Sequence, residues 1–186
     1  MGRITTTAIA ALAVASLSLG ATRSTARTTA VDRTPGALDD PTIVAIFDAA
    51  NTADIETGTL AAERAASKEV RDFGSMLARD HKQVRQLGRD LAKKLGVTPT
   101  PPKDDRSAKD HAAAMSRLRG LNGPAFDQAF LQHEAAFHKA VIDAVTSALL
   151  PAVQNAELKA LVVQVAPAFE AHMIAAQQLE KKLAGR

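Results

Sequence analysis

Five ionisable side chains stand at inward-facing positions of four stretches that have a helical period. They are Glu56, His81, Glu134, His138 and His172. Imidazole nitrogens and carboxylate oxygens are the donors that proteins use to bind zinc, iron, copper and nickel. Burying so many polar groups without partners would cost several kcal/mol, which is comparable to the stability of a whole domain. The set therefore predicts either a shared divalent transition metal ion or a tight hydrogen-bonded network.

These residues are expected at one level of an antiparallel bundle. Glu56 lies about a dozen residues before the first interhelical turn, and His81 lies about a dozen residues after it. An α-helix rises about 1.5 Å per residue, so the two side chains should meet at one height. The same count around the last turn places Glu134 or His138 within roughly one helical turn of His172.

The donor set differs from that of a carboxylate-bridged di-iron centre. Such a centre takes a Glu from each of two helices and a Glu-x-x-His motif from each of the other two. That motif is absent from the second and fourth helical stretches. A mononuclear site is therefore favoured over a ferroxidase or an oxygen-activating enzyme, and no catalytic residue is predicted. Asp80 either orients His81 or faces solvent, while His111 and His133 lack partners on a stripe and are interpreted as ordinary polar residues.

Apolar residues three and four positions apart predict the helices that carry this set. The four long helices are expected after Pro41 and over residues 68–95, 124–150 and 155–183, where Pro151 should stop the third. A shorter helix is expected over residues 107–118, in a connection long enough to cross the bundle. Pro167 should remove one hydrogen bond of the fourth helix and kink it. The predicted fold class is all-α, a ferritin-like four-helix bundle with an extra short helix between the second and third helices.

The beginning of the chain is predicted to be a signal peptide. Arg3 precedes an apolar run of about a dozen residues, from Ala8 to Leu19, which is too short to span a bilayer. Several small residues between positions 20 and 30 are suitable cleavage sites. We therefore expect residues 1–30 to be removed, residues 31–40 to form a disordered linker, and residues 41–186 to form the bundle of an exported protein, periplasmic or secreted.

Composition excludes several other classes of protein. The chain has no cysteine, so disulfides, thiolate metal sites and lipid-modified cysteines are excluded. The formal net charge of +3 falls to 0 when residues 1–30 are removed, because Arg3, Arg23 and Arg27 are lost. A neutral mature protein gives no electrostatic case for binding nucleic acid. No transmembrane segment is predicted after signal cleavage, and no protein partner is identified.

Four sequence blocks resemble a bacterial family, the domain of unknown function 4142, whose members are often labelled outer membrane proteins. The blocks are residues 53–61, 73–81, 123–138 and 167–172, and the resemblance extends over about residues 42–183. It implies a ferritin-like bundle in an exported bacterial protein with no established reaction. One departure is Phe130, where the family more often has Tyr. The residues that match the recurrent polar positions of the family are Glu56, Asp80, His81, His138 and His172.

Two functions from different classes remain open. The first is a metal-binding protein of the cell envelope, acting in metal handling or stress protection, with the five residues of the set as ligands. The second is a non-catalytic structural or interaction protein of the envelope, in which the same residues form a buried polar network without metal. Elemental analysis of native protein, purified without added metal or a His-tag, would distinguish the two.

Overall fold

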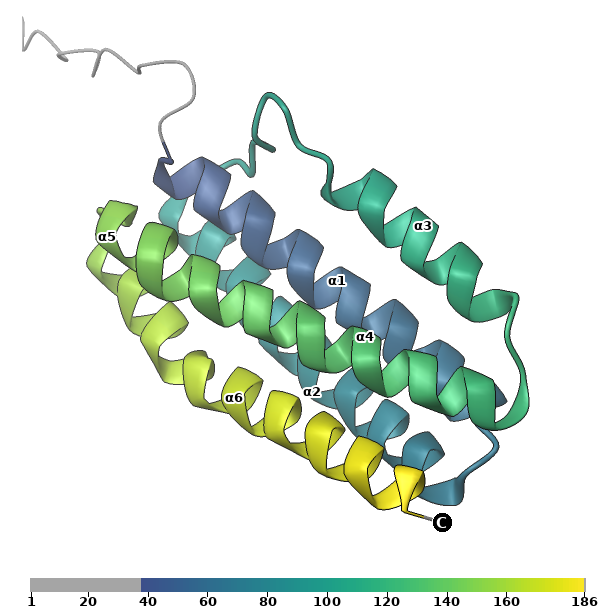
Figure 1. Ribbon diagram of the computed structural model, residues 1–186. Coiled ribbons are helices and arrows are strands. Elements are labelled where there is room, and N and C mark those ends of the chain that lie inside the picture. Colours follow the sequence, from purple (N-terminus) through teal and green to yellow (C-terminus); the bar gives the residue numbers. More distant parts are fainter. Residues whose placement is uncertain (1–37, 186) are drawn as a thin grey trace, which may run out of the picture. The chain divides into compact units, whose positions relative to one another are not determined.

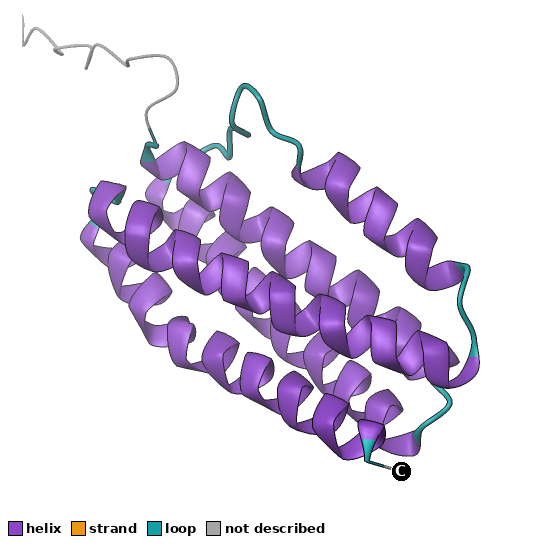
Figure 2. Ribbon diagram, viewed as in Figure 1, coloured by secondary structure: helices purple, strands orange, loops and turns teal. Residues whose placement is uncertain are grey.

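The computed structural model describes residues 38–185. The predicted signal peptide and most of the predicted linker lie outside the described residues. Figures 1 and 2 show that the described part of the chain consists of helices joined by loops, with no strand. The predicted fold class, an all-α helical bundle, is confirmed.

The long helices have nearly the bounds that the apolar periodicity predicts. The elements are α1 (Asp40–Arg64), α2 (Lys68–Leu95), α3 (Ser107–Arg119), α4 (Gly123–Ala144), the π-helix η1 (Val145–Leu149), α5 (Leu150–Ala152) and α6 (Ala156–Ala184). The predicted range of α2 is correct at both ends. The glycine after it, Gly96, takes a φ of 65° that suits a residue without a side chain, and this ends the helix.

The bundle is formed by α1, α2, α4 and α6, and α3 lies outside it along α1 and α4 (Figure 1). In the α1–α2 and α4–α6 pairs each helix runs antiparallel to its partner. The connection between α2 and α4 crosses from one end of the bundle to the other, as its length predicts, and α3 occupies much of it. Met115 and Leu118 of α3 are buried against the bundle.

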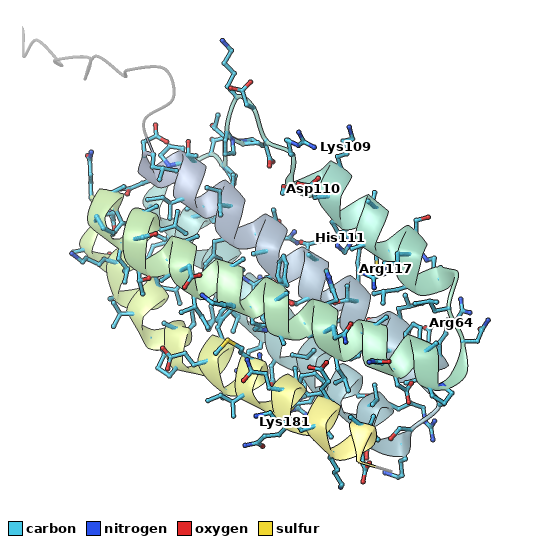
Figure 3. The ribbon with its side chains drawn as sticks, in the orientation of Figure 1. Arg64, Lys109, Asp110, His111, Arg117 and Lys181 are labelled. Carbon is cyan, nitrogen blue, oxygen red and sulfur yellow. The ribbon has the colours of Figure 1, made fainter. Side chains whose placement is uncertain are left out.

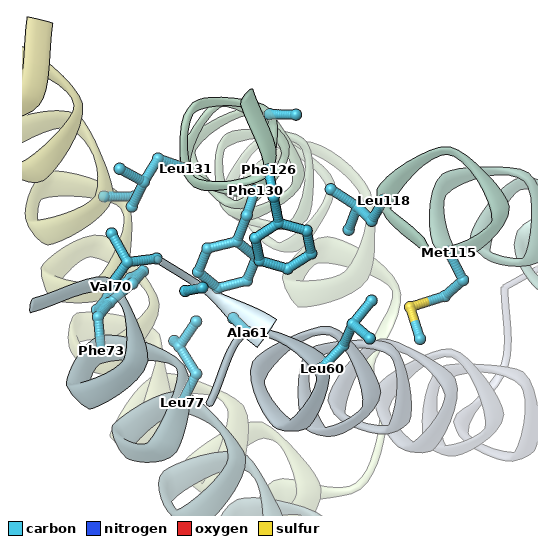
Figure 4. Close-up of a cluster of buried hydrophobic side chains, with 13 residues drawn as sticks. Leu60, Ala61, Val70, Phe73, Leu77, Met115, Leu118, Phe126, Phe130 and Leu131 are labelled. Atoms are coloured by element: carbon cyan, nitrogen blue, oxygen red, sulfur yellow. The ribbon is translucent and has the colours of Figure 1, made fainter. Parts of the chain in front are cut away.

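The end of the bundle that contains the α1–α2 turn is called the closed end. Its core is a cluster of aromatic and aliphatic side chains around Phe73, Phe126 and Phe130 (Figure 4). The backbones of α1 and α2 approach closely here, because Gly58 and Gly74 face each other. Apolar packing of this kind, with rings 6.1 and 6.2 Å apart, fixes the spacing of the four helices.

The opposite end, called the α5 end, contains the start of α1, the end of α2, and the turn from α5 into α6. Its core includes Ile43, Leu149 and Leu158. The prediction that Pro151 stops the third helix is wrong in detail. Pro151 has no N–H for the carbonyl four residues earlier, and the preceding turn widens to a π-helix before α5 ends at Ala152.

The last helix, α6, continues through Pro167. Its length and composition alone would allow it to cross a membrane, a property it shares with the core helices of soluble bundles. In this bundle its buried side chains extend from Leu158 through Phe169 to Ala176, while Val163 and Ile174 are exposed. The apolar character of α6 is therefore used in packing against α2 and α4.

Candidate metal centre

Three histidines from three different helices converge at mid-bundle. They are His81 of α2, His138 of α4 and His172 of α6, and their side chains are almost completely buried. One nitrogen of each ring lies within 4.8 Å of a nitrogen of the other two. The ring centroids are 5.1 to 5.5 Å apart. The sequence predicted this convergence, and the name "histidine triad" is used for it below.

The hydrogen bonds of His81 determine which of its nitrogens carries a proton. Asn51 donates its amide N–H to the carbonyl of Phe47, so its Oδ1 is an acceptor. That oxygen lies 2.9 Å from Nδ1 of His81, which must therefore be the donor. A neutral His81 then has its lone pair on Nε2, directed toward the triad.

A carboxylate outside the triad orients His172 in the same way. Nε2 of His172 lies 3.3 Å from Asp80 Oδ2, and Arg79 donates to the other oxygen of that carboxylate. Nε2 therefore carries a proton, and Nδ1 holds the lone pair. The sequence led us to weigh Asp80 as a partner of its neighbour His81, whereas the structure pairs it with a histidine on α6.

His138 completes the pattern. Its Nδ1 donates to the backbone carbonyl of Glu134, at 2.9 Å, one turn earlier in α4. Its Nε2 is buried and has no hydrogen-bond partner among the described residues. All three imidazoles therefore have one nitrogen held by an acceptor outside the triad and the other without a partner outside it, which is how histidines are oriented around a metal ion.

The distance between two of these nitrogens is informative. Nε2 of His81 and Nδ1 of His172 are 3.2 Å apart, and both hold lone pairs when the rings are neutral. Two lone pairs at that distance repel each other unless a proton or a metal ion lies between them. Two metal–nitrogen bonds of about 2.0 Å at a tetrahedral angle place their nitrogens about 3.3 Å apart. The residues therefore fit a transition metal ion.

Burial keeps the triad neutral. It lowers the pKa of His81 to about 2 and the pKa of His138 to about 4, and the neighbouring histidines add to both effects. It also lowers the pKa of His172, although Asp80 opposes this. At neutral pH the lone-pair nitrogens of the triad are therefore unprotonated, so protons compete only weakly with a metal ion for them.

Two buried carboxylates lie behind the triad. Asp54 Oδ2 is 3.4 Å from Nδ1 of His81, and Glu134 Oε2 is 3.5 Å from Nδ1 of His138. Their oxygens have no hydrogen-bond donor among the described residues. Burial raises the pKa of both groups, to about 7 for Glu134, and the proximity of Glu134 adds to the rise for Asp54. The pair supplies negative charge beside the imidazoles only when its protons are released, and with His138 it forms a second group whose atoms could hold a metal ion.

The structure does not bring Glu56 to this layer. Its side chain is half exposed and accepts a hydrogen bond of 2.8 Å from Nε2 of His111 on α3. Figure 3 shows His111 on the side of α3 that faces the bundle. Leu60, one turn after Glu56, reaches the core of the closed end, whereas Glu56 points toward α3 and solvent.

Two polar residues of the site were missed by reasoning from the sequence. Asp54 and Asn51 occupy the true inward stripe of α1, which continues through Gly58 and Ala61. Their helical spacing could have revealed them, because the four positions 51, 54, 58 and 61 are three, four and three residues apart. The alanine-rich helix offers two such stripes, and a stripe alone does not show which one faces the bundle.

Comparisons with known proteins agree with this fold. A solved structure titled "CopM in the Cu(II)-bound form" superposes with a TM-score of 0.60. It is 13% identical, and the match covers 78% of this chain and 98% of that chain. No curated protein matches the sequence. A family model described as "Domain of unknown function (DUF4142)" matches residues 24–179, which is most of the chain, and the protein therefore belongs to this family.

Proposed function

We propose that this protein binds one transition metal ion at the histidine triad. The ligands are Nε2 of His81, Nε2 of His138 and Nδ1 of His172. The observation that carries the proposal is the distance of 3.2 Å between Nε2 of His81 and Nδ1 of His172. The other nitrogen of each ring lies beside a protein acceptor, Asn51 for His81 and Asp80 for His172. The proposal omits two ligands predicted from the sequence, because Glu134 lies behind the triad and Glu56 pairs with His111.

The charges around the triad favour a divalent cation. The buried polar side chains among the described residues include Asp54, Asp127 and Glu134 but no lysine or arginine. A dication at the triad balances the two carboxylates that lie behind the imidazoles, so the centre as a whole is neutral. Without the cation, at least one of these carboxylates must be protonated or left buried without a counter-charge.

Copper(II) and zinc are the first candidates, because both accept three imidazole nitrogens. The copper-bound form of the solved structure of similar fold makes copper(II) the natural first choice. With the predicted signal peptide, we assign the protein to metal handling or stress protection in the cell envelope. The alternative is a scaffold whose histidines form a polar network without metal.

A metal titration tests the proposal. Protein without an affinity tag is stripped with a chelator and titrated with copper(II) or zinc in a calorimeter, and thermal unfolding is followed with and without each metal. We expect one equivalent to bind and the melting temperature to rise, because the metal binds only the folded state. His172→Ala should abolish both effects. His133→Ala is the matched control, since His133 is partly buried but lies outside the triad, and it should bind like the wild type.

The scaffold alternative gives a different pattern. Wild-type protein would then have the same melting temperature in chelator and in every metal tried. His172→Ala would be destabilised by about 1 to 3 kcal/mol under both conditions, because it leaves buried polar partners unpaired. That result would overturn the metal proposal.

A further inference from the structure

A cavity of about 90 Å³, partly open to solvent beside Thr146 and Glu170, lies in the α5 end of the bundle. Its walls come from α1, from the end of α4 with η1, and from α6. The lining side chains that matter below are Phe47, Ala50, Asn51, Thr146, Ala166 and Phe169. The π-turn of η1 and the small side chains of Ala50 and Ala166 leave this space unfilled.

The cavity adjoins the histidine triad. Phe169 lines the cavity, and its ring centroid is 5.1 Å from that of His81 and 5.8 Å from that of His138. Asn51 also lines it while bonding to Nδ1 of His81. A single layer of side chains therefore separates the cavity from the proposed metal ligands.

The side chains that line the cavity offer few hydrogen-bond partners to a water molecule. Apart from the exposed Glu170, its polar side chains are already engaged within the protein. Asn51 donates to Phe47 and accepts from His81, and the Thr146 hydroxyl donates to the carbonyl of Ile142. A buried water needs two to four polar partners, and apolar cavities without them stay dry and take up molecules such as xenon or benzene.

We propose that this cavity is a binding site for a small, neutral, apolar molecule, which is held one side chain away from the histidine triad. The lining and volume select against ions and against ligands that need hydrogen bonds. The inference depends on the cavity alone, so it can hold or fail independently of metal binding.

Xenon is a suitable probe because it is neutral, apolar and small. Metal-free protein with labelled methyl groups is placed under xenon pressure and its NMR spectrum is recorded. We expect shifts of the methyl signals of Ile43 and Val165, which line the cavity, and none at Leu131 in the closed end. Performing the experiment in chelator separates its outcome from that of the metal titration.

Two variants that fill the cavity complete the test. Ala50→Leu and Ala166→Leu add side-chain volume from different walls, so the test survives if one of them fails to fold. Both should abolish the xenon-dependent shifts. Val163→Leu adds a carbon at a position on α6 that is 53% exposed, and it should leave the shifts unchanged. Absence of shifts in the wild type, or their persistence in both filled variants, would overturn the proposal.

Discussion

The two ends of the bundle use the same four helices but pack them differently. At the closed end, a Cβ atom built on Gly58 or Gly74 would lie 2.7 Å from the carbonyl oxygen of the other residue, so two backbones are in contact. At the α5 end, the equivalent place between α1 and α2 is filled by the ring of Phe47 lying over Gly88, beside the cavity. Backbone contacts cannot shift, whereas a side chain beside a cavity can. The histidine triad lies between a fixed end and an adjustable one.

Glycine substitutions test this difference most strongly. Gly58→Ala or Gly74→Ala should lower the free energy of unfolding by about 3 kcal/mol, because the new methyl group meets backbone. Gly88→Ala should cost less, about 1 kcal/mol, because the Phe47 ring can move toward the cavity. Urea denaturation measures all three. Gly120→Ala, whose Cβ would be 3.4 Å from its nearest neighbour, is the control, and equal losses at Gly58 and Gly88 would refute the comparison.

The layer between the two ends should make stability depend on pH. The raised pKa of Glu134, about 7, means that the folded protein binds a proton that the unfolded chain releases above about pH 4.5. This group therefore adds stability as the pH falls from 7 toward 4.5. The triad acts in the opposite direction, because its lowered pKa values favour protonation of the unfolded chain below about pH 6.5. Asp54, whose pKa burial also raises, acts in the same direction as Glu134, so in the wild type these two carboxyls oppose part of the effect of the three histidines.

Glu134→Gln should reveal how the histidines contribute to the pH dependence of the free energy of unfolding. In chelator, its free energy of unfolding should fall more steeply than that of the wild type as the pH is lowered from 7 to 5. The difference in slope should approach about 1.4 kcal/mol per pH unit, the value for one proton. Urea denaturation at several pH values measures it. Glu170→Gln, at an exposed carboxylate, is the control, and parallel curves for Glu134→Gln and wild type would contradict the assignment.

The smallest expected effects concern the turns at the two ends. Asp127 accepts hydrogen bonds from the backbone N–H groups of Ala66 and Ser67, where α2 begins. Asp40 does the same for Gln154 and Asn155, where α6 begins. Asp127 is 3% exposed and Asp40 is more exposed, so the N–H groups freed at the closed end would lack water. Asp127→Ala should therefore cost about 2 kcal/mol and Asp40→Ala about 1 kcal/mol in thermal unfolding.

A matched control isolates the loss of these caps. Asp143 lies on the surface of α4 and pairs only with Lys139 one turn earlier in the described structure. Such an exposed pair contributes little, so Asp143→Ala should change stability by less than about 0.5 kcal/mol. A smaller loss for Asp127→Ala than for Asp40→Ala would show that the closed end is not the more tightly packed one.

The helices could be predicted from the sequence because their stripes are long and their ends carry clear signals. Gly96 and the prolines after it mark the end of α2, and Pro124 marks the start of α4. The π-turn of η1 could not be predicted, because a proline near a helix end has several local solutions. Pro151 was therefore placed correctly as a disruption but not as part of a short α5.

The site residues could be predicted on helices that bury a single face in the bundle. In α2 and α6 the triad histidine lies on the predicted apolar stripe, and in α4 His138 lies one position beside it; all three converge as expected. In α1 both faces are buried, one by the bundle and one by α3, so Glu56 was chosen in place of Asp54. The partnership of Asp80 with His172 joins residues 92 positions apart, and only the docked helices reveal it.

The carboxylate of Asp127 has a consequence for the order of folding. It accepts from the N–H groups of Ser67 and Ala66, immediately before α2, from a position 60 and 61 residues farther along the chain. The α1–α2 hairpin can form from local contacts, but its turn acquires this acceptor only when α4 docks. Contacts that form after the transition state slow unfolding and leave the folding rate nearly unchanged. We therefore expect the Asp127 contact to form late in folding, so that Asp127→Ala speeds unfolding more than it slows folding.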